Sequence, residues 1–179
     1  DANGGYDDGY QLDENGKVVW ISKEGGDDYD VLYNSDNSDK IIVNEVGILG
    51  QLSNERTDYP GYYATTSNGE EALKIFTFAS DNSSYEWGLT QYSNEYAVNT
   101  SPNYISKFAN NGSLASLSYS PNFSNKNSVF TAHSHVGKDA TKGPSTPDQN
   151  SVLHTQATNR YIYHTNTKTW YKYSSRTID

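Results

Sequence analysis

The sequence predicts a strand-rich protein with few helices, on three observations. Its 179 residues are rich in tyrosine, threonine, valine, isoleucine, asparagine, glycine and serine, which favour strands and turns over helices. Short apolar runs separated by turn-forming segments recur along the chain. The best helical pattern is confined to residues 67–81. The length suits one domain with its own core, and a second full domain is not expected.

Composition also limits the partners and the chemistry. The net charge of −9 argues against a nucleic-acid backbone or an anionic membrane as the main partner. No stretch is long and apolar enough for a membrane span, and no signal-peptide pattern opens the chain. The absence of cysteine excludes disulfides and thiolate zinc sites, so any metal must be bound by His, Asp or Glu. Methionine is also absent, even at position 1, and we therefore expect a fragment or processed product of a longer protein.

The N-terminal part of the chain is predicted to be rich in strands. Residues 10–21 have the pattern of a hairpin, with Asn15-Gly16 as a type I′ turn between its two strands. A further strand is predicted at residues 29–33 and is followed by a polar turn. The nearly continuous apolar run in residues 40–52 predicts one or two buried strands.

A helix is predicted to begin at Ser67 and to end near Asp81. Ser67 and Glu70 have the spacing of a capping box, in which each side chain satisfies a free backbone N–H of the first turn. Apolar residues recur at positions i, i+3, i+4 and i+7 and form one apolar face, made of Ala72, Ile75, Phe76 and Ala79. A strand is then predicted at residues 85–92.

The rest of the chain has weaker patterns. Residues 94–127 are polar, with a short helix or strand expected around residues 104–117. A short helix is possible at residues 151–157. Alternating large residues in 160–173 predict a closing hairpin, with its turn at residues 165–168.

The residues best suited to chemistry lie at the end of a predicted buried strand that begins at Val129. Residues two apart on a strand point to the same face, so His133 and His135 can converge on one point. A polar, glycine-containing loop then leads to Ser145 and Asp148. Two imidazoles and a carboxylate form a three-ligand set that leaves the fourth position of a zinc ion open for water, as in catalytic zinc sites. A bare His-x-His is also common on a solvated strand.

This run resembles the JAMM motif of the JAB/MPN metalloprotease family, which combines an upstream glutamate, His-x-His, a loop and Ser-x-x-Asp. The matching positions are His133, His135, Ser145 and Asp148. Two features differ from the usual family pattern. Val136 stands where the family usually has proline, and the loop of residues 136–144 is longer than usual.

The resemblance implies a Zn²⁺ ion held by His133, His135 and Asp148, with roles in hydrolysis for two further residues. In the family the catalytic glutamate lies where the first helix gives way to a central strand, and Glu86 matches that position. Glu45 is an alternative whose local sequence is closer to the family pattern, but no helix is predicted before it. The motif serine supplies a hydrogen bond to the oxyanion, which implies that role for Ser145.

The resemblance also implies an α/β fold with a curved mixed β-sheet and few flanking helices, as in JAB/MPN and cytidine-deaminase-like proteins. Residues 67–179 would form this metalloprotease domain, and residues 1–66 a β-rich N-terminal extension packed on it. The implied reaction is hydrolysis of a peptide or isopeptide bond in a protein or peptide substrate, and JAB/MPN relatives often cleave ubiquitin-like conjugates.

A narrower resemblance concerns the whole chain. The tyrosine-rich chain without an initiator methionine is similar to the JAB-like modules at the C-termini of bacterial RHS-repeat-associated polymorphic toxins. That resemblance implies delivery as part of a larger bacterial protein and a cognate immunity protein as a partner.

Two other functions stay open. Some family members keep the fold and lose the ligands, which allows a catalytically inactive binding or scaffold module. The motif specifies the chemistry better than the substrate, which allows a zinc hydrolase of a non-peptide amide. His154 and His164 are additional histidines, and we expect them to be surface or hydrogen-bonded groups rather than ligands.

Overall fold

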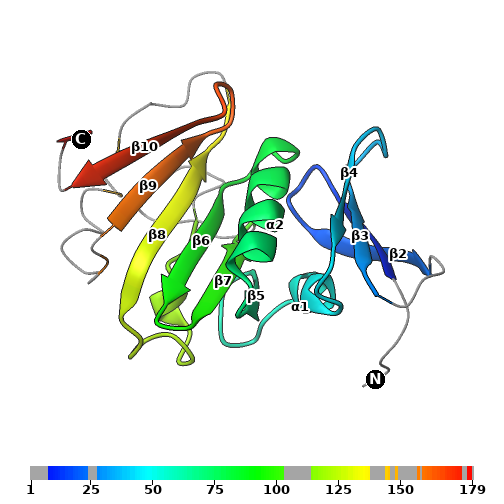
Figure 1. Cartoon of the computed structure of the whole chain (residues 1–179), viewed down its shortest axis with the longest axis horizontal. Helices are drawn as coiled ribbons and strands as arrows, with labels where there is room; N and C mark the ends of the chain where they lie inside the picture. Colours follow the sequence, from blue (N-terminus) through cyan, green and yellow to red (C-terminus); the bar gives the residue numbers. More distant parts are fainter. Residues whose placement is uncertain are drawn as a thin grey trace.

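The computed structural model describes residues 8–23, 28–102, 114–137, 144–145, 148, 157, 159–174 and 177–178. Over these residues the fold is α/β and strand-rich with few helices, as predicted, and it contains two α-helices and two sheets. The N-terminal sheet has four strands in the order β2-β1-β3-β4, and the main sheet has seven in the order β11-β10-β9-β8-β6-β7-β5. Helix α2 lies between the two sheets (Figure 1).

The N-terminal sheet is followed by a short helix. Its elements are β1 Asp8–Leu12, β2 Val18–Lys23, β3 Asp30–Tyr33, β4 Lys40–Val43 and α1 Ile48–Ser53. The expectation of one or two strands in residues 40–52 is wrong in its second half, because that half forms α1. Strand β4 ends at Val43, and Gly47, whose φ is 90°, is the N-cap of a helix in which Ile48, Leu49 and Leu52 share one buried face.

The turn between β1 and β2 is not of type I′. That type needs positive φ at both central residues, and here Gly16 (φ 70°) has it while Asn15 does not. The Asp13 side chain provides the reason. Its Oδ1 accepts hydrogen bonds from Asn15 N at 2.9 Å and from Lys17 N at 2.8 Å, and it therefore stabilises a longer loop.

The main sheet is mixed. Its strands are β5 Tyr62–Thr66, β6 Trp87–Tyr92, β7 Glu95–Thr100, β8 Ser128–His135, β9 Asn159–His164, β10 Thr169–Ser174 and β11 Thr177–Ile178. The β8–β9 pair is parallel and the other pairs are antiparallel. The predicted strand at 85–92 and hairpin at 160–173 are confirmed, whereas β7 was not predicted.

Two weaker expectations are tested only at their edges. A 3-10 helix, η1 Leu117–Tyr119, begins at the end of the segment expected around residues 104–117. Most of that segment, and the helix expected at residues 151–157, lie outside the described residues.

Helix α2 spans Gly69–Asp81, and its cap differs from the prediction. The N-cap is Asn68 rather than Ser67, because Asn68 Oδ1 accepts from Glu70 N at 3.1 Å and Glu71 N at 3.3 Å. The predicted apolar face is confirmed, and all four of its residues are fully buried: Ala72, Ile75, Phe76 and Ala79. The face packs on the main sheet, where the Phe76 ring lies 6.0 Å from that of Tyr163.

The two faces of the main sheet have different coverings. Leu89, Ala132 and Tyr163 belong to the large core that includes α2, and we call their side of the sheet the helix face. The opposite side carries a second apolar cluster, made of Tyr59, Tyr63, Tyr92, Ala97, Ala115, Leu117 and Phe123. Three of these residues come from the segment 115–123, which therefore covers that opposite face.

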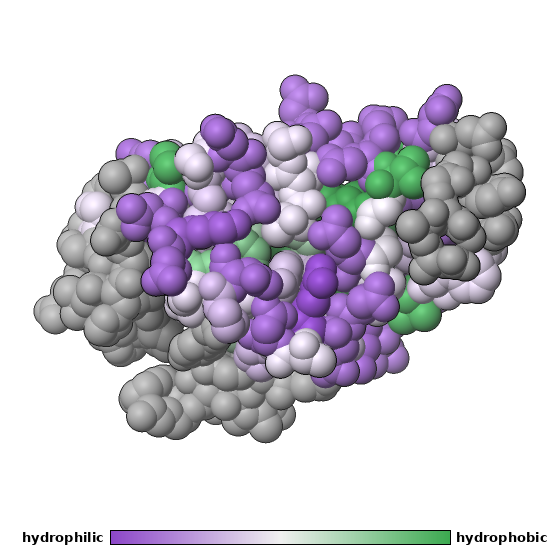
Figure 2. Space-filling model, turned by 90° about the horizontal axis from the view of Figure 1, so that it is seen from below, coloured by the Kyte–Doolittle hydropathy of each residue, from purple (hydrophilic) through white to green (hydrophobic). Residues whose placement is uncertain are grey.

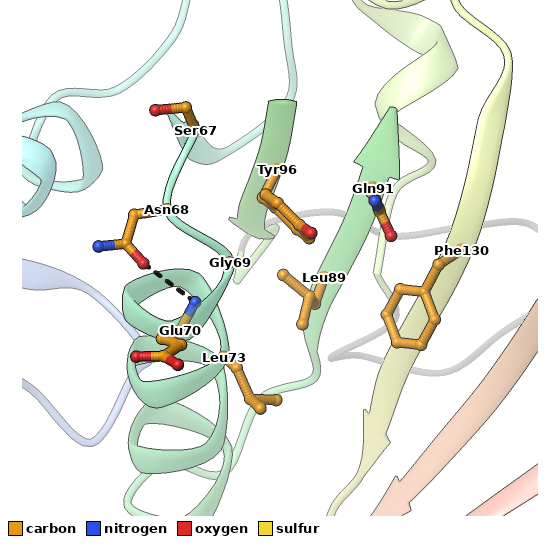
Figure 3. A pocket seen from close by; sticks show the side chains of 9 residues that line it. All are labelled: Ser67, Asn68, Gly69, Glu70, Leu73, Leu89, Gln91, Tyr96 and Phe130. Carbon is orange, nitrogen blue, oxygen red and sulfur yellow. Dashed lines mark hydrogen bonds between the residues drawn. The ribbon is translucent and has the colours of Figure 1, made fainter. Parts of the chain in front are cut away.

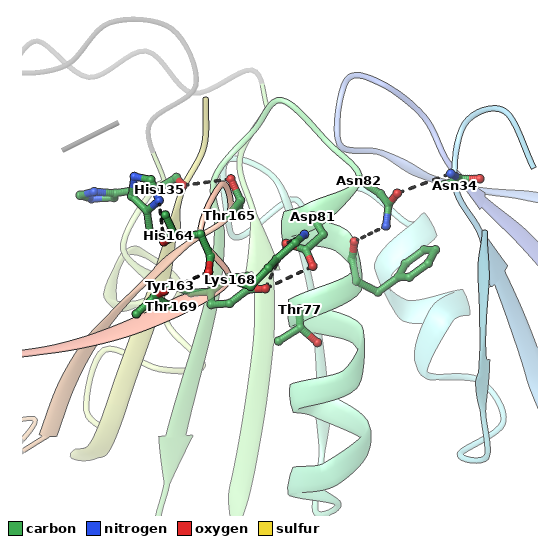
Figure 4. Close-up of polar contacts among 12 residues, drawn as sticks. Asn34, Thr77, Asp81, Asn82, His135, Tyr163, His164, Thr165, Lys168 and Thr169 are labelled. Atoms are coloured by element: carbon green, nitrogen blue, oxygen red, sulfur yellow. Dashed lines mark hydrogen bonds and ion pairs between the residues drawn. The ribbon is translucent and has the colours of Figure 1, made fainter. Parts of the chain in front are cut away.

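Polar contacts join the N-terminal sheet to α2. The buried Glu71 carboxylate accepts from Asn44 N at 3.1 Å and from Asn44 Nδ2 at 3.0 Å. At the other end of the helix, Asn34 Nδ2 lies 3.5 Å from Asn82 Oδ1 (Figure 4). On the side of the molecule drawn in Figure 2, polar residues predominate and apolar residues form small separate areas. No helix in the described part of the chain has the length and hydropathy needed to cross a membrane.

Candidate metal centre

Two histidines project from the end of β8 on the side of the sheet opposite α2. Their neighbour Ala132 faces the helix, and strand alternation therefore turns His133 and His135 to the other side, which we call the histidine face. The two Nε2 atoms are 3.1 Å apart. The prediction that the two imidazoles converge on one point is confirmed by this distance.

Asp148 completes a group of three potential ligands. Its Oδ1 lies 3.1 Å from His133 Nε2, and its Oδ2 lies 3.3 Å from His135 Nε2. The ligand atoms all lie within 4.8 Å of one another, so the group could hold a metal ion. Two imidazole nitrogens and one carboxylate oxygen, with no thiolate in the chain, fit zinc and leave a fourth position open.

The charges within this group reinforce one another in the metal-free chain. Burial by itself would lower the pKa of His133, but the Asp148 carboxylate outweighs burial and raises that pKa to about 9. Burial would raise the pKa of Asp148, but the positive charge of His133 and the hydrogen bonds from the histidines and Ser145 hold that pKa far below its ordinary value. A proton and a bound cation would therefore compete for His133 Nε2.

Ser145 contacts Asp148 directly. Both its backbone N and its Oγ donate to Asp148 Oδ2 at 2.6 Å. These bonds fix the orientation of the carboxylate, as expected of a residue that supports a metal ligand. The hydroxyl proton is thus directed at Asp148, and it must rotate before it can donate to a substrate oxygen.

Glu86 lies on the histidine face immediately before β6. Trp87 is buried in the helix-face core, and Gly88 pairs with His133 across the strands, so alternation places the Glu86 side chain on the side of His133. Glu86 Oε2 accepts a hydrogen bond from Leu114 N at 3.3 Å. Burial raises the pKa of the Glu86 carboxyl, and the positive charges of the two nearby histidines oppose this shift.

Glu45 lies elsewhere in the fold. It precedes α1, and its carboxylate accepts a hydrogen bond from the Thr66 hydroxyl at the C-terminal end of β5. Thr66 pairs with Tyr96 at one end of β5. The other end of β5 pairs with Thr100, and Thr100 also pairs with Trp87, the residue after Glu86. The structure therefore brings Glu86, and not Glu45, to the histidine end of the sheet.

Of the two additional histidines, His164 is buried and next to the site. It pairs with His135 between β9 and β8, and its Nδ1 lies 3.3 Å from Thr167 Oγ1. Thr165 N and Oγ1 both donate to His135 O at 3.2 Å, which ties the hairpin turn to the end of β8 (Figure 4). His164 is outside the three-ligand group. His154 lies outside the described residues.

Sequence reasoning missed two residues that shape the site. A Cβ on Gly88 would meet Asn99 Oδ1 at 2.4 Å and Leu114 Cδ2 at 2.7 Å, so this position is too crowded for a side chain. The signal for it was a glycine inside a strand pattern, which often marks a close approach. Leu114 carries no such signal, because it contributes a backbone N–H from a distant segment.

A shallow groove elsewhere on the sheet is separate from this centre. It lies between the start of α2 and strands β6 to β8, and Leu73, Leu89, Tyr96 and Phe130 contribute apolar lining (Figure 3). Leu89 belongs to the helix-face core, so the groove opens on the side away from His133. It offers no part of the metal centre.

A mixed sheet with a His-His-Asp group at the end of a central strand defines a JAB-like α/β module. The chain belongs to the JAB-like toxin 1 family, whose model matches residues 64–155. The matched residues include α2, β6, β7 and β8 and all three potential ligands. The comparisons with curated proteins and with solved structures found no match.

Proposed function

We propose that this JAB-like toxin domain is a zinc-dependent hydrolase of peptide or isopeptide bonds. The observation that carries the proposal is the placement of Glu86 on the same face as the convergent group His133, His135 and Asp148. Three ligands with an open position are typical of catalytic rather than structural zinc sites. Zinc held there would acidify a water molecule and polarise the scissile carbonyl.

Glu86 is the proposed general base. Its raised pKa, caused by burial, brings the carboxyl closer to the pH range in which it can accept a proton from the attacking water and pass it to the leaving amine. Its hydrogen bond from Leu114 N fixes one carboxylate oxygen, which leaves the other for the water.

Ser145 is proposed to act twice. In the substrate-free chain it orients Asp148 through two hydrogen bonds. When substrate is bound, rotation of the hydroxyl would direct its proton to the oxyanion, while the backbone N–H keeps Asp148 in place. Ser145 Oγ donates to the Asp148 carboxylate, whose pKa is held far below its ordinary value, so this carboxylate is a poor base and Ser145 is not the proposed nucleophile.

The proposal also includes a domain boundary and two kinds of partner. Strand β5 pairs with β7, so residues 62–66 lie in the main sheet although we expected them in the extension. We therefore place the boundary of the hydrolase domain before β5. A protein or peptide is the proposed substrate, and a cognate immunity protein is the proposed inhibitor.

The test uses the full chain purified without chelator. Zinc content is measured, and turnover is assayed on peptides, on ubiquitin-like isopeptide conjugates and on small non-peptide amides. We expect one zinc per chain, and loss of that zinc in His133→Ala and His135→Ala. Glu86→Gln should keep the zinc and lose roughly 10²–10⁴-fold in kcat, because the amide cannot accept a proton. Glu45→Gln is the matched control and should have normal turnover.

Three outcomes would contradict parts of the proposal. Zinc that persists in the His133→Ala/His135→Ala double variant would place the metal elsewhere. An inactive Glu45→Gln with an active Glu86→Gln would reverse the assignment of the base. A zinc-loaded chain without turnover on the whole panel would favour a binding module, and turnover confined to the small amides would change the substrate class.

A further inference from the structure

The segment beside Glu86 is held by buried hydrogen bonds that come from three other parts of the chain. Leu114 N donates to Glu86 Oε2 at 3.3 Å. The next residue, Ala115, uses both of its backbone groups. Its N donates to Ser101 Oγ at 3.0 Å, and its carbonyl oxygen accepts from Tyr59 OH at 2.7 Å.

Asn99 closes this network. Its Nδ2 donates to Tyr59 OH at 2.7 Å and lies 3.4 Å from Ala115 O. Because Tyr59 gives its hydroxyl proton to Ala115 O, Ser101 Oγ must be the donor in its 2.7 Å contact with Tyr59 OH. The directions of all these bonds are therefore consistent, and no two donors or two acceptors oppose each other.

The network is almost completely removed from water. The exposed fractions are 3% for Tyr59, 2% for Asn99, 2% for Ser101 and 1% for Ala115. Buried polar groups that lose a partner cannot replace it with water, so each bond is costly to break. The backbone of Leu114 and Ala115 is thus held in one position.

That position determines where the Glu86 carboxylate points. The main chain of Glu86 is already fixed, because its carbonyl accepts from Thr100 Oγ1 at 3.1 Å and β6 begins at the next residue. The carboxylate is at the end of a side chain with several rotatable bonds, and its hydrogen bond in the described structure is the one from Leu114 N. A base must be held within about an ångström of its productive place to act efficiently.

We infer that Tyr59, Asn99 and Ser101 are positioning residues for Glu86, acting through Leu114 and Ala115. This inference rests on the proposed function for the role of Glu86. Tyr59 precedes β5 and lies outside the family-matched residues 64–155. The working centre therefore includes a residue from the N-terminal part of the chain.

The experiment compares two tyrosine-to-phenylalanine variants of the full chain. Tyr59→Phe removes the hydroxyl at the middle of the network. Tyr62→Phe is the matched control, because Tyr62 is also buried (6% exposed) and its hydroxyl has no hydrogen bond to a described residue. The readouts are the exchange rates of the Leu114 and Ala115 amides, the ¹³Cδ shift of Glu86, zinc content, kcat and KM.

For Tyr59→Phe we expect exchange at Leu114 and Ala115 to be at least roughly tenfold faster, since the buried bonds of both backbone groups of Ala115 depend on the network. The Glu86 ¹³Cδ shift should move, and kcat should fall roughly 10- to 100-fold with zinc content and KM unchanged. Tyr62→Phe should match the wild type in every readout. If Tyr59→Phe does not fold, Ser101→Ala removes the acceptor of Ala115 N and tests the same backbone segment.

An unchanged Leu114 exchange rate and Glu86 shift in Tyr59→Phe would overturn the inference. So would an unchanged kcat despite faster exchange, or the same loss of kcat in Tyr62→Phe, since that would be general destabilisation. A wild type without turnover on any substrate contradicts the hydrolase proposal alone. In that case the Glu86 shift still decides whether Tyr59 positions Glu86.

Discussion

Zinc binding should depend steeply on pH, because the metal and a proton compete for His133. In the metal-free chain His133 Nε2 lies 3.1 Å from Asp148 Oδ1, and this carboxylate raises the pKa of His133 to about 9 although burial opposes it. Zinc needs the lone pair of the neutral imidazole. Below pH 9, each zinc ion that binds should therefore displace a proton from His133.

The magnitude follows from that pKa. At pH 7, about two units below it, only about 1% of the metal-free chain carries a neutral His133, against about half at pH 9, so the apparent Kd should be about 50-fold weaker at pH 7 than at pH 9. Each unit of pH from 6 to 8 should change the Kd about tenfold. Calorimetric titration in buffers of different ionisation enthalpy measures both the Kd and the number of protons released.

The matched control is His164→Gln, which changes a buried histidine outside the ligand group. It should bind zinc with the wild-type pH dependence. A Kd that stays constant from pH 6 to 8, with no proton released per zinc, would refute the coupling of His133 to Asp148. Loss of the pH dependence in His164→Gln would show that the displaced proton comes from His164 and not from His133.

The same pair sets a pH window for the stability of the metal-free chain. The folded pKa of His133 is raised above its unfolded value of about 6.5. The stability that His133 contributes to the fold is therefore complete below about pH 6.5 and is lost as pH rises through 9. The folded pKa of Asp148 is lowered, so its contribution is present above about pH 4 and is lost as pH falls. Without zinc, stability should peak between these limits.

Three substitutions, one of them with a matched control, test other parts of the structure. Ser145→Ala should weaken zinc binding roughly 10- to 100-fold, because it removes one of the two hydrogen bonds that orient Asp148. At saturating zinc it should lower kcat roughly 10²–10³-fold, and normal turnover there would remove Ser145 from catalysis. Gly88→Ala should destabilise the chain by about 1–3 kcal/mol through overpacking, as measured by urea unfolding. Phe76→Ala should cost about 3–5 kcal/mol, while the exposed Leu73→Ala on the same helix should cost less than about 1 kcal/mol.

The parts of the fold that local sequence could predict are those with a clear period. The four apolar positions of α2 recur with the helical period, and the large residues of the closing hairpin alternate, so each was expected where it was found. Strand β8 was expected from the short apolar run that begins at Val129. The short apolar run at Ile48–Leu52 was expected as a strand, because a run of that length does not distinguish a helix from a buried strand. Strand β7 was missed in a polar segment, since its pairing with β5 and β6 is what makes it a strand.

For the candidate site, the sequence by itself determined the potential ligands. The shared direction of His133 and His135 follows from the two-residue period of a strand, which is a local property. The resemblance of the run to a known motif added Asp148 and Ser145.

Only the tertiary structure decided which glutamate accompanies these ligands and what holds it. Glu86 reaches the histidine face because β6 pairs with β8 in a particular register, whereas Glu45 is at the far end of β5. The hydrogen bond from Leu114 and the network centred on Tyr59 join residues far apart in the chain. Such contacts depend on how distant segments pack, and no local pattern in the sequence encodes that packing.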